Sequence, residues 1–183
     1  MKELLHPDLE YVLYTKEEIA RRVEVLGEMI TQEYRGKELL CVGILKGAVV
    51  FYADLIRAIR CELATDFMAV SSYGASTQTS GTVRIVKDLN EDIAGRDVLI
   101  VEDILDTGLT LHYLRRLLME RNPASIRICT LFDKRERRAA DIQADYVGFQ
   151  IPDAFIVGYG LDYAEKYRNL PYVGILSSRV YAK

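Results

Sequence analysis

Residues 97–110 read DVLIVEDILDTGLT, an aliphatic run that passes into three acidic residues and then into a small polar turn. The aliphatic part, Val98 to Val101, is typical of a strand that is covered on both faces of a sheet. Leucines recur at helical spacing after the turn and end before Pro123, at Leu111, Leu114, Leu117 and Leu118. We therefore predict a strand, a turn and a helix in succession, the unit from which parallel α/β sheets are built.

Helical and strand patterns alternate along the rest of the chain. Thr15-Lys16-Glu17-Glu18 is a capping box, and apolar residues at helical spacing follow it as far as Gly36. Leu39–Leu45 is a second continuous apolar run, and Ala48–Ile59 is a second helical pattern. Further strands are predicted over residues 67–73, 82–86, 125–132, 146–149, 155–157 and 172–176. The alternation predicts an α/β fold with a mostly parallel, twisted sheet flanked by helices.

The composition describes an ordinary globular chain. It has 183 residues, 50% of them apolar, and no repeat or linker divides it, so we expect one domain over residues 1–183. A chain of this length buries enough surface to fold without disulfides. Of its three cysteines, Cys41 and Cys129 lie inside apolar runs, which indicates core residues and not a disulfide framework or a zinc site.

The net charge and the apolar runs of the chain indicate which classes of partner it lacks. There are 24 basic and 27 acidic residues, for a net charge of -3, so the chain lacks a global field that would hold a polyanion, and we expect no nucleic-acid partner. The N-terminus does not have the apolar stretch of a signal peptide, and no apolar run is long enough to cross a membrane. These features predict a cytoplasmic protein without a membrane partner.

A small polar segment, Gly74–Gly81, separates two of the predicted strands. It has little apolar surface to bury and should therefore be mobile. It reads equally well as a plain hairpin tip and as a lid over an active site.

Three carboxylates in five positions, Glu102, Asp103 and Asp106, form the strongest functional signal. A helix cap at Asp106 or Thr107 explains one acid and leaves two charges at the edge of a core strand, where unpaired charge is costly. Carboxylates suit a cation or sugar hydroxyls, and the amides that open the next helix suit phosphate. Together they predict a sugar-phosphate site, which in such sheets lies beyond the carboxyl ends of the strands.

The segment Glu102–Thr110 resembles the phosphoribosyl-pyrophosphate signature of type I phosphoribosyltransferases. Other stretches resemble the hypoxanthine-guanine branch of that family, bacterial type, in the same order: Leu45-Lys46-Gly47, Ser72-Tyr73-Gly74, Lys134, Ile151 to Tyr163, and Arg168. The resemblance implies the type I phosphoribosyltransferase fold, with a core at about residues 37–150. It also implies a small hood, made by the N-terminal segment and about residues 151–183, and a mobile hairpin lid.

The resemblance implies a purine-salvage reaction in which N9 of hypoxanthine, and also of guanine, displaces pyrophosphate from phosphoribosyl pyrophosphate with Mg²⁺ as cofactor. Glu102 and Asp103 would hold the ribose hydroxyls and the metal, and Asp162 would lie at the magnesium–pyrophosphate end. Lys46 and Gly47 would form a pyrophosphate loop with unusual peptide geometry, such as a cis bond. Ile104 and Leu105 would also belong to the substrate-binding signature, and the 5′-phosphate would bind to its remaining residues, Asp106, Thr107, Gly108, Leu109 and Thr110.

For the purine, the resemblance implies that Asp106 is the general base and Lys134 the donor to the 6-oxo group. An ammonium has donors only, which favours an oxo group over the amino group of adenine. Without the resemblance, Lys134 reads as a solvated member of a charge run and Phe155 as a core residue. The family also implies base stacking by Phe155, a backbone contact from Ile156, pyrophosphate binding by Arg168, and lid positions for Ser72 and Tyr73.

Two departures and two alternatives remain at this point. Leu109 and Ser71 stand where some family members carry lysine, from which we expect an altered affinity for the sugar phosphate. One alternative is an RNA-binding attenuator on the same fold, for which a net charge of -3 is poor support. The other is a transferase for xanthine or another base. A homodimer or homotetramer is a family expectation.

Overall fold

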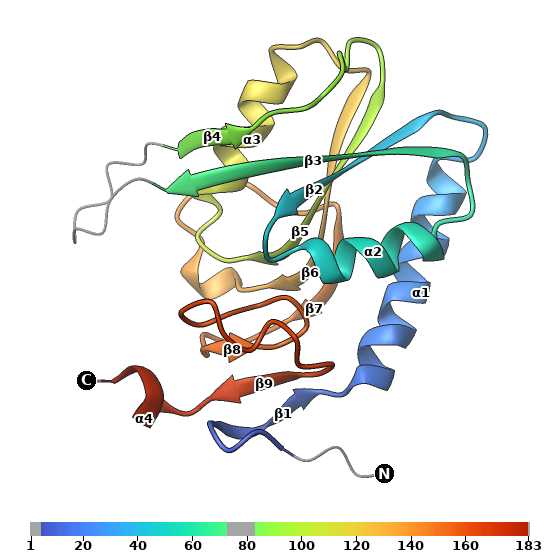
Figure 1. Cartoon of the computed structure of the whole chain (residues 1–183). Helices are drawn as coiled ribbons and strands as arrows, with labels where there is room; N and C mark the ends of the chain where they lie inside the picture. Colours follow the sequence, from blue (N-terminus) through green and yellow to red (C-terminus); the bar gives the residue numbers. More distant parts are fainter. Residues whose placement is uncertain (1–4, 73–82, 183) are drawn as a thin grey trace.

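A computed structural model describes residues 5–72 and 83–182, arranged around two sheets (Figure 1). The larger sheet has six strands in the order β4-β3-β2-β5-β6-β7, all parallel except β4, which is antiparallel to β3. Its strands are β2 (Leu39–Leu45), β3 (Leu63–Ser72), β4 (Val83–Lys87), β5 (Asp97–Leu105), β6 (Ser125–Asp133) and β7 (Tyr146–Gln150). The prediction of a mostly parallel sheet flanked by helices is confirmed.

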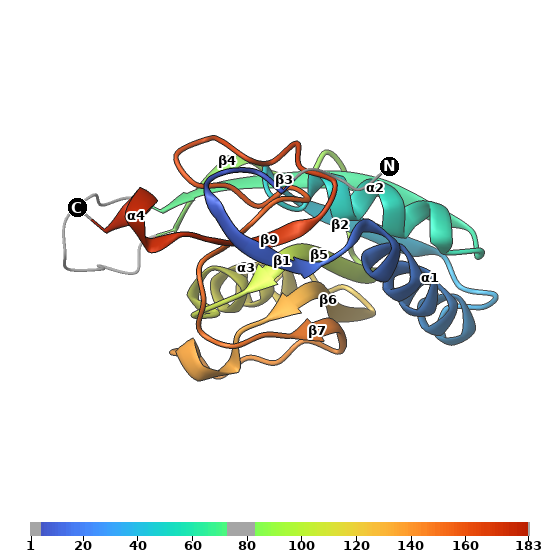
Figure 2. The same cartoon turned by 90° about the horizontal axis from the view of Figure 1, so that it is seen from below.

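Helices cover both faces of this sheet, as Figures 1 and 2 show. On one face, α1 (Lys16–Glu33) and α2 (Val49–Ala58) pack on alternate residues of the central strands, such as Cys41 and Leu99. On the other face, α3 (Leu109–Met119) packs on the residues between them, such as Val42 and Ile100. Because both faces are buried, the central strands are continuously apolar instead of alternating.

The second sheet lies below the carboxyl ends of the large sheet in Figure 1 and has the order β1-β9-β8, all antiparallel. Its strands are β1 (Leu9–Tyr14), β8 (Ile156–Val157) and β9 (Val173–Leu176), and a short helix α4 (Ser178–Tyr181) follows. The chain therefore returns its C-terminal segment to a strand from its N-terminal segment. No strand was predicted over residues 9–14, which form β1 by pairing with β9.

The two principal helix starts differ. Thr15 and Glu18 form the predicted capping box of α1, with the Thr15 backbone N–H donating to Glu18 Oε2 at 2.8 Å. The start of α3 excludes the purely structural interpretation of Asp106 or Thr107 as a helix cap. Its N-cap is Gly108, in the left-handed region at φ 80, without a side-chain cap. A Cβ at Gly108 would lie 2.6 Å from Ile142 Cγ2, so both the conformation and the close approach favour glycine.

Strand β5 also corrects the sequence analysis, which ended the strand at Val101. It pairs with β6 as far as Leu105, opposite Asp133. Glu102 and Asp103 therefore lie within the strand, and the turn begins at Asp106. A pairing partner on the neighbouring strand keeps the chain extended through the two acidic residues, which no local pattern reveals.

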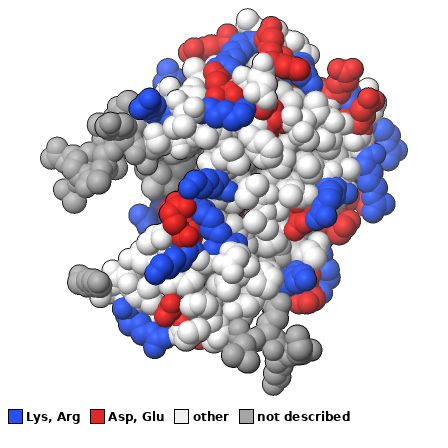
Figure 3. Space-filling view, viewed as in Figure 1, with Lys and Arg blue, Asp and Glu red and all other residues white. Residues whose placement is uncertain are grey.

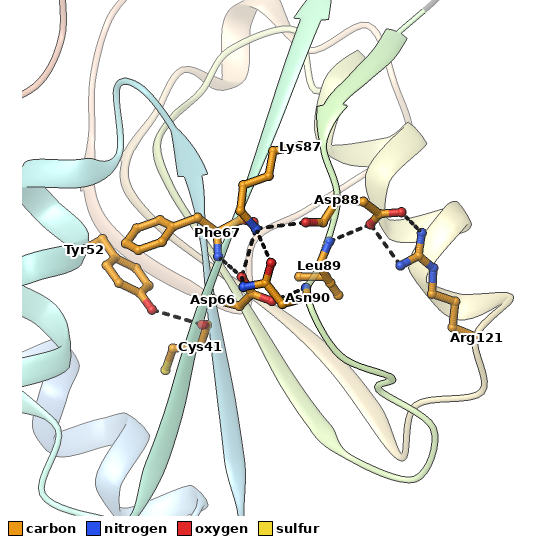
Figure 4. Close-up of polar contacts among 9 residues, drawn as sticks. All are labelled: Cys41, Tyr52, Asp66, Phe67, Lys87, Asp88, Leu89, Asn90 and Arg121. Atoms are coloured by element: carbon orange, nitrogen blue, oxygen red, sulfur yellow. Dashed lines mark hydrogen bonds and ion pairs between the residues drawn. The ribbon is translucent and has the colours of Figure 1, made fainter.

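A polar cluster around the buried Asp66 fixes the base of the β3–β4 hairpin (Figure 4). The Asp66 carboxylate accepts hydrogen bonds from the backbone N–H groups of Phe67 and Asn90, both at 2.7 Å, and from Lys87 Nζ at 3.1 Å. Asp88 adds a bidentate pair with Arg121, at 2.9 and 2.7 Å, just beyond α3. These contacts join β3 to the end of β4 and to the segment that follows it. The predicted lid at Gly74–Gly81 lies outside the described residues.

Cys41 and Cys129 are fully buried, as predicted for core residues, and Cys61 is half-buried. Burial raises the pKa of the Cys41 thiol to about 12. Among the described residues, none of the helices has the length and apolar character needed to cross a membrane.

Candidate active site

A cavity of about 530 Å³ lies beyond the carboxyl ends of β2, β3 and β5. Strands β2 and β5 are neighbours in the sheet, but the chain continues from β2 to β3 on one side and from β5 to β6 on the other. The loops that follow β2 and β5 therefore diverge, and such a point in a parallel sheet opens a crevice for ligands. In Figure 3 the surface is hollowed on the side toward which these strands run, and side chains of both signs are interspersed over the rest of that face. The cavity is lined by Ile44, Leu45, Val70, Glu102, Asp103, Ile104, Leu105, Asp106, Thr107, Gly108, Thr110, Leu111 and Asp162.

Glu102 and Asp103 provide the acidic wall of the cavity. Asp103 is 7% exposed, and its Oδ1 accepts from the Ile104 N–H at 2.7 Å. Burial raises the pKa of both carboxyls, and the neighbouring charge of Asp103 raises that of Glu102 further. Such a pair gains most from a ligand that brings positive charge or hydroxyl donors.

The loop after β2 packs directly against this wall. A Cβ on Gly47 would lie 2.0 Å from Asp103 Oδ2, so only glycine allows the approach. The peptide bond between Leu45 and Lys46 is cis, and the sequence analysis expected unusual peptide geometry in this loop. Lys46 itself is exposed and its Nζ forms an ion pair with Glu165 Oε2 at 3.1 Å.

The backbone of the turn after β5 is held by the Arg138 side chain and by backbone N–H groups of the segment after β6. Arg138 donates to the carbonyl oxygens of Asp106 at 3.1 Å, Leu105 at 3.3 Å and Ile142 at 2.6 Å. The Thr107 carbonyl accepts from two further backbone N–H groups. This support leaves the first-turn N–H groups of α3, which have no intrahelical acceptor, at the edge of the cavity.

The Asp106 side chain does not take part in these hydrogen bonds. Its Oδ1 is buried and has no hydrogen-bond partner among residues 5–72 and 83–182. The nearest cation is the Arg137 guanidinium, whose Nε lies 3.5 Å away without hydrogen-bond geometry. A buried carboxylate oxygen without a donor is costly unless a ligand supplies one, which marks Asp106 as a ligand-facing group.

Lys134 corrects the reading of this residue as part of a solvated charge run. It is 5% exposed, and its Nζ donates to the Ala154 carbonyl at 2.9 Å and lies 3.6 Å from Asp153 Oδ1. Strand β6 ends at Asp133, so Lys134 turns under the segment that leads into β8. Its burial comes from residues twenty positions away, which a local charge pattern does not contain.

Asp162 and Arg168 meet on the loop between β8 and β9. Arg168 Nη2 lies 2.8 Å from Asp162 Oδ1, and Nη1 donates to the Gly160 carbonyl at 2.7 Å. The buried Arg168 Nε has no hydrogen-bond partner within the described part of the chain. Asp162 lines the cavity, so the structure brings this loop, the loop of Gly47 and the acidic wall together.

The remaining residues singled out in the sequence have different surroundings in the structure. Phe155 is 38% exposed, so it is not the core residue that its spacing suggests, and its ring stacks on Tyr181 at 5.2 Å between centroids. Ile156 is buried at the start of β8 and pairs with Ile175. Ser72 ends β3, and Tyr73 lies outside the described residues. Leu109 is exposed at the start of α3, and Ser71 pairs with Arg84 in the hairpin.

The carboxylates of the cavity fit a hard divalent cation. Mg²⁺ is commonly held by one or two carboxylates together with the phosphates of a substrate and not by a cage of protein ligands. Glu102, Asp103 and Asp162 offer oxygen donors around one cavity, while the described residues contain no ready-made cluster of three His, Cys, Asp or Glu ligands. The arrangement therefore fits a metal that arrives with its substrate.

Comparisons with known proteins agree with this geometry. The model of the phosphoribosyl transferase domain matches residues 12–164. A hypoxanthine-guanine phosphoribosyltransferase of Bacillus subtilis (strain 168) is 56% identical over 178 residues, which cover 97% of this chain and 99% of that protein. This chain belongs to the hypoxanthine-guanine phosphoribosyltransferase family.

Solved structures of hypoxanthine phosphoribosyltransferases share the fold of this chain as well. A hypoxanthine phosphoribosyltransferase from Staphylococcus aureus superposes with a TM-score of 0.95 at 52% identity, covering 100% of both chains. A hypoxanthine phosphoribosyl transferase from Trypanosoma cruzi superposes with a TM-score of 0.92 at 41% identity, covering 98% of this chain and 97% of that one. The chain is thus an enzyme with the type I phosphoribosyltransferase fold, and the comparisons favour this reading over an RNA-binding attenuator.

Sequence reasoning missed three residues that shape the phosphoribosyltransferase site. Arg137 and Asp153 lie between Asp106 and Lys134, and Arg138 supports the turn after β5. Arg137 and Arg138 were hidden in the charge run after β6, and Asp153 carried no pattern of its own. Only their contacts with segments distant in the sequence reveal them.

Proposed function

We propose that this phosphoribosyltransferase joins N9 of hypoxanthine or guanine to C1 of the phosphoribosyl group, forming the nucleotide and releasing pyrophosphate. The bond to the pyrophosphate oxygen breaks as the bond to N9 forms, through a state with oxocarbenium character. The observation that carries the proposal is one cavity that joins an acidic wall, the N-terminus of α3 and the unpartnered oxygen of Asp106.

The sugar phosphate fits the part of the cavity between β2 and β5. Glu102 and Asp103 would accept hydrogen bonds from the ribose hydroxyls, and the amides from Asp106 to Thr110 would hold the 5′-phosphate. An anion at a helix N-terminus is favoured by the free N–H groups and by the helix dipole. The loop at Lys46 and Gly47, together with Arg168, would receive the pyrophosphate through backbone amides and a guanidinium.

The purine fits between Asp106 and Lys134. Asp106 would take a proton from the imidazole edge of the base, and its free Oδ1 leaves a lone pair for that purpose. Lys134 would donate to the 6-oxo group, while Phe155 and the backbone of Ile156 would flank the ring. Because Lys134 is buried, an adenine amino group opposite it would leave two donors facing each other.

Mg²⁺ is the cofactor that fits this reaction, since it would neutralise charge on the departing pyrophosphate. Glu102, Asp103 and Asp162 are the residues that would hold it. Their contribution is to orient the diphosphate and to keep oxygen donors at a fixed place beside the ribose.

Other features of the proposal rest on family likeness. A single domain over residues 1–183, with a core, a hood and a lid that carries Ser72 and Tyr73, accords with the two sheets. The T. cruzi structure was described for the role of its C-terminal region in oligomeric state and activity, and a homodimer or homotetramer is proposed here on that likeness. The cytoplasmic location of the protein remains a prediction from its sequence.

The test offers phosphoribosyl pyrophosphate and Mg²⁺ with hypoxanthine, guanine, xanthine, adenine and uracil in separate reactions, and measures nucleotide formation. We expect products from hypoxanthine and guanine. Turnover of adenine alone would preserve the reaction class and overturn the role of Lys134, and turnover of xanthine alone would preserve that role and replace the proposed substrate. No turnover with any base, alongside tight and specific RNA binding, would overturn the enzyme proposal.

A further inference from the structure

A line of alternating charges crosses the proposed base pocket. Arg137 Nε lies 3.5 Å from Asp106 Oδ1, and Arg137 Nη1 lies 3.8 Å from Asp153 Oδ1. The same Asp153 oxygen lies 3.6 Å from Lys134 Nζ. The two residues that the proposed function sets at opposite edges of the purine are therefore connected by one arginine and one aspartate, in the order Asp106–Arg137–Asp153–Lys134.

The arginines beside Arg137 have other tasks. Arg135, at the start of the same 3-10 turn η1 (Arg135–Arg137), pairs with Asp133 at 3.2 Å and points to a different carboxylate. Arg138 donates to Asp133 and to three backbone carbonyl oxygens. Arg137 alone, among the arginines of the segment 135–138, reaches the Asp106 side chain.

The contact of Arg137 with Asp106 has an unusual form. The Oδ1 atom is buried without a hydrogen bond, so the arginine lies beside the carboxylate and leaves its lone pair unoccupied. A proton acceptor needs such a free lone pair. An ion pair that served only stability would gain more from a direct hydrogen bond, and an exposed pair contributes little stability in any case.

We propose that Arg137 is a positioning residue, which orients Asp106 toward the imidazole edge of the purine and, through Asp153, sets the distance to Lys134. The inference rests on the proposed function. It predicts that Arg137 affects use of the base and leaves the sugar-phosphate loop unchanged, since that loop is held by Arg138. A small displacement of a reacting group lowers rate strongly, so the effect appears in the base step.

The experiment compares Arg137→Ala and Arg137→Lys with Arg135→Ala, the matched control on the same turn. Arg137→Ala should lower kcat/KM for hypoxanthine by about tenfold and leave the KM for phosphoribosyl pyrophosphate unchanged. Arg137→Lys should restore part of the loss, and Arg135→Ala should stay within twofold of the unsubstituted enzyme. Thermal unfolding midpoints check that every variant is folded.

A double-mutant cycle tests the path through Asp153. Asp153→Asn and Arg137→Ala should together cost less than the product of their separate fold losses, because both break one chain of contacts. Independent effects would overturn the role of Asp153. Equal effects of Arg137→Ala and Arg135→Ala, or a parallel rise in the KM for phosphoribosyl pyrophosphate, would overturn the inference while the unsubstituted enzyme remains active. An inactive unsubstituted enzyme would instead overturn the proposed function.

Discussion

The two ends of the large sheet each carry a cavity, and the larger one lies away from the proposed chemistry. At the amino ends of β2 and β3, a cavity of about 670 Å³ is lined mainly by charged residues of the loops and of the end of α1, such as Glu38, Lys37 and Arg60. At the carboxyl ends, a cavity of about 530 Å³ contains the acidic wall and the turn of Asp106. Volume and charge alone do not separate the two.

What separates them is how their polar groups are held. At the carboxyl ends, a buried acid touches a glycine loop and a buried carboxylate oxygen lacks a donor. At the amino ends, Glu38, Lys37 and Glu62 are exposed to solvent. Solvated charges interact weakly, whereas polar groups fixed in a buried site are ready for a ligand. Each of the following predictions compares a variant at the carboxyl ends of the strands with a control variant at the amino ends.

The largest effect is expected from Asp106→Asn. The amide keeps the shape of the side chain but cannot take a proton, so kcat should fall by roughly 10²- to 10⁴-fold. Steady-state kinetics with hypoxanthine measures the loss. Glu38→Gln makes the same change of chemistry at the amino end and should leave kcat within twofold. A loss below tenfold in Asp106→Asn would remove Asp106 from proton transfer.

The next effect concerns two glycines. Gly47→Ala places a methyl group where Asp103 Oδ2 now lies 2.0 Å away, so the loop or the acid must move, and binding of phosphoribosyl pyrophosphate should weaken by tenfold or more, about 1.4 kcal/mol. Isothermal titration measures the affinity. Gly36→Ala is the control at the amino end: its φ of +76 costs roughly 1 kcal/mol of stability, and no atom lies within 4 Å. Equal affinities in both variants would contradict the close approach.

Lys134→Met tests the edge of the base. The variant keeps the length of the buried side chain and removes its donor, so kcat/KM for hypoxanthine should fall by roughly 10- to 100-fold, with a smaller loss for adenine. Competition between the two bases measures the change in preference. Lys37→Met, at an exposed lysine of the amino end, should leave both values unchanged. An unaltered preference in Lys134→Met would show that recognition of the 6-oxo group lies elsewhere.

The smallest effect is a gain in stability. Because burial and the neighbouring acid raise the pKa of Glu102, its ionised form destabilises the fold above that pKa. This cost disappears as the pH falls toward the pKa of an unfolded glutamate. Glu102→Gln should therefore raise the free energy of unfolding at pH 8 by about 1 kcal/mol and by less at pH 4, while binding of phosphoribosyl pyrophosphate weakens.

Urea unfolding at the two pH values measures this difference. Glu62→Gln, at the amino end, should change the free energy of unfolding by less than about 0.5 kcal/mol at either pH. A Glu102→Gln variant that is less stable at pH 8 would show that the acidic wall is already satisfied by the protein.

Much of the sheet was predictable because its signals are local or periodic. Continuous apolar runs identified β2 and β5, and the capping box identified the start of α1. The strand over residues 9–14 was missed, because it forms only by pairing with β9 at the far end of the chain. The extension of β5 through Glu102 and Asp103 was missed for a related reason, since its partner residues lie on β6.

The features of the candidate site also separate into those that local sequence predicts and those that depend on distant contacts. The sequence by itself determined the acidic triplet, the helix that follows it and the resemblance to one enzyme family, since spacing and residue chemistry are local properties. Only the tertiary structure decided that Gly47 touches Asp103, that Lys134 is buried beneath Ala154, and that Arg137 lies between Asp106 and Asp153. These contacts depend on the order of strands in the sheet and on packing between segments far apart in the chain, which no local pattern contains.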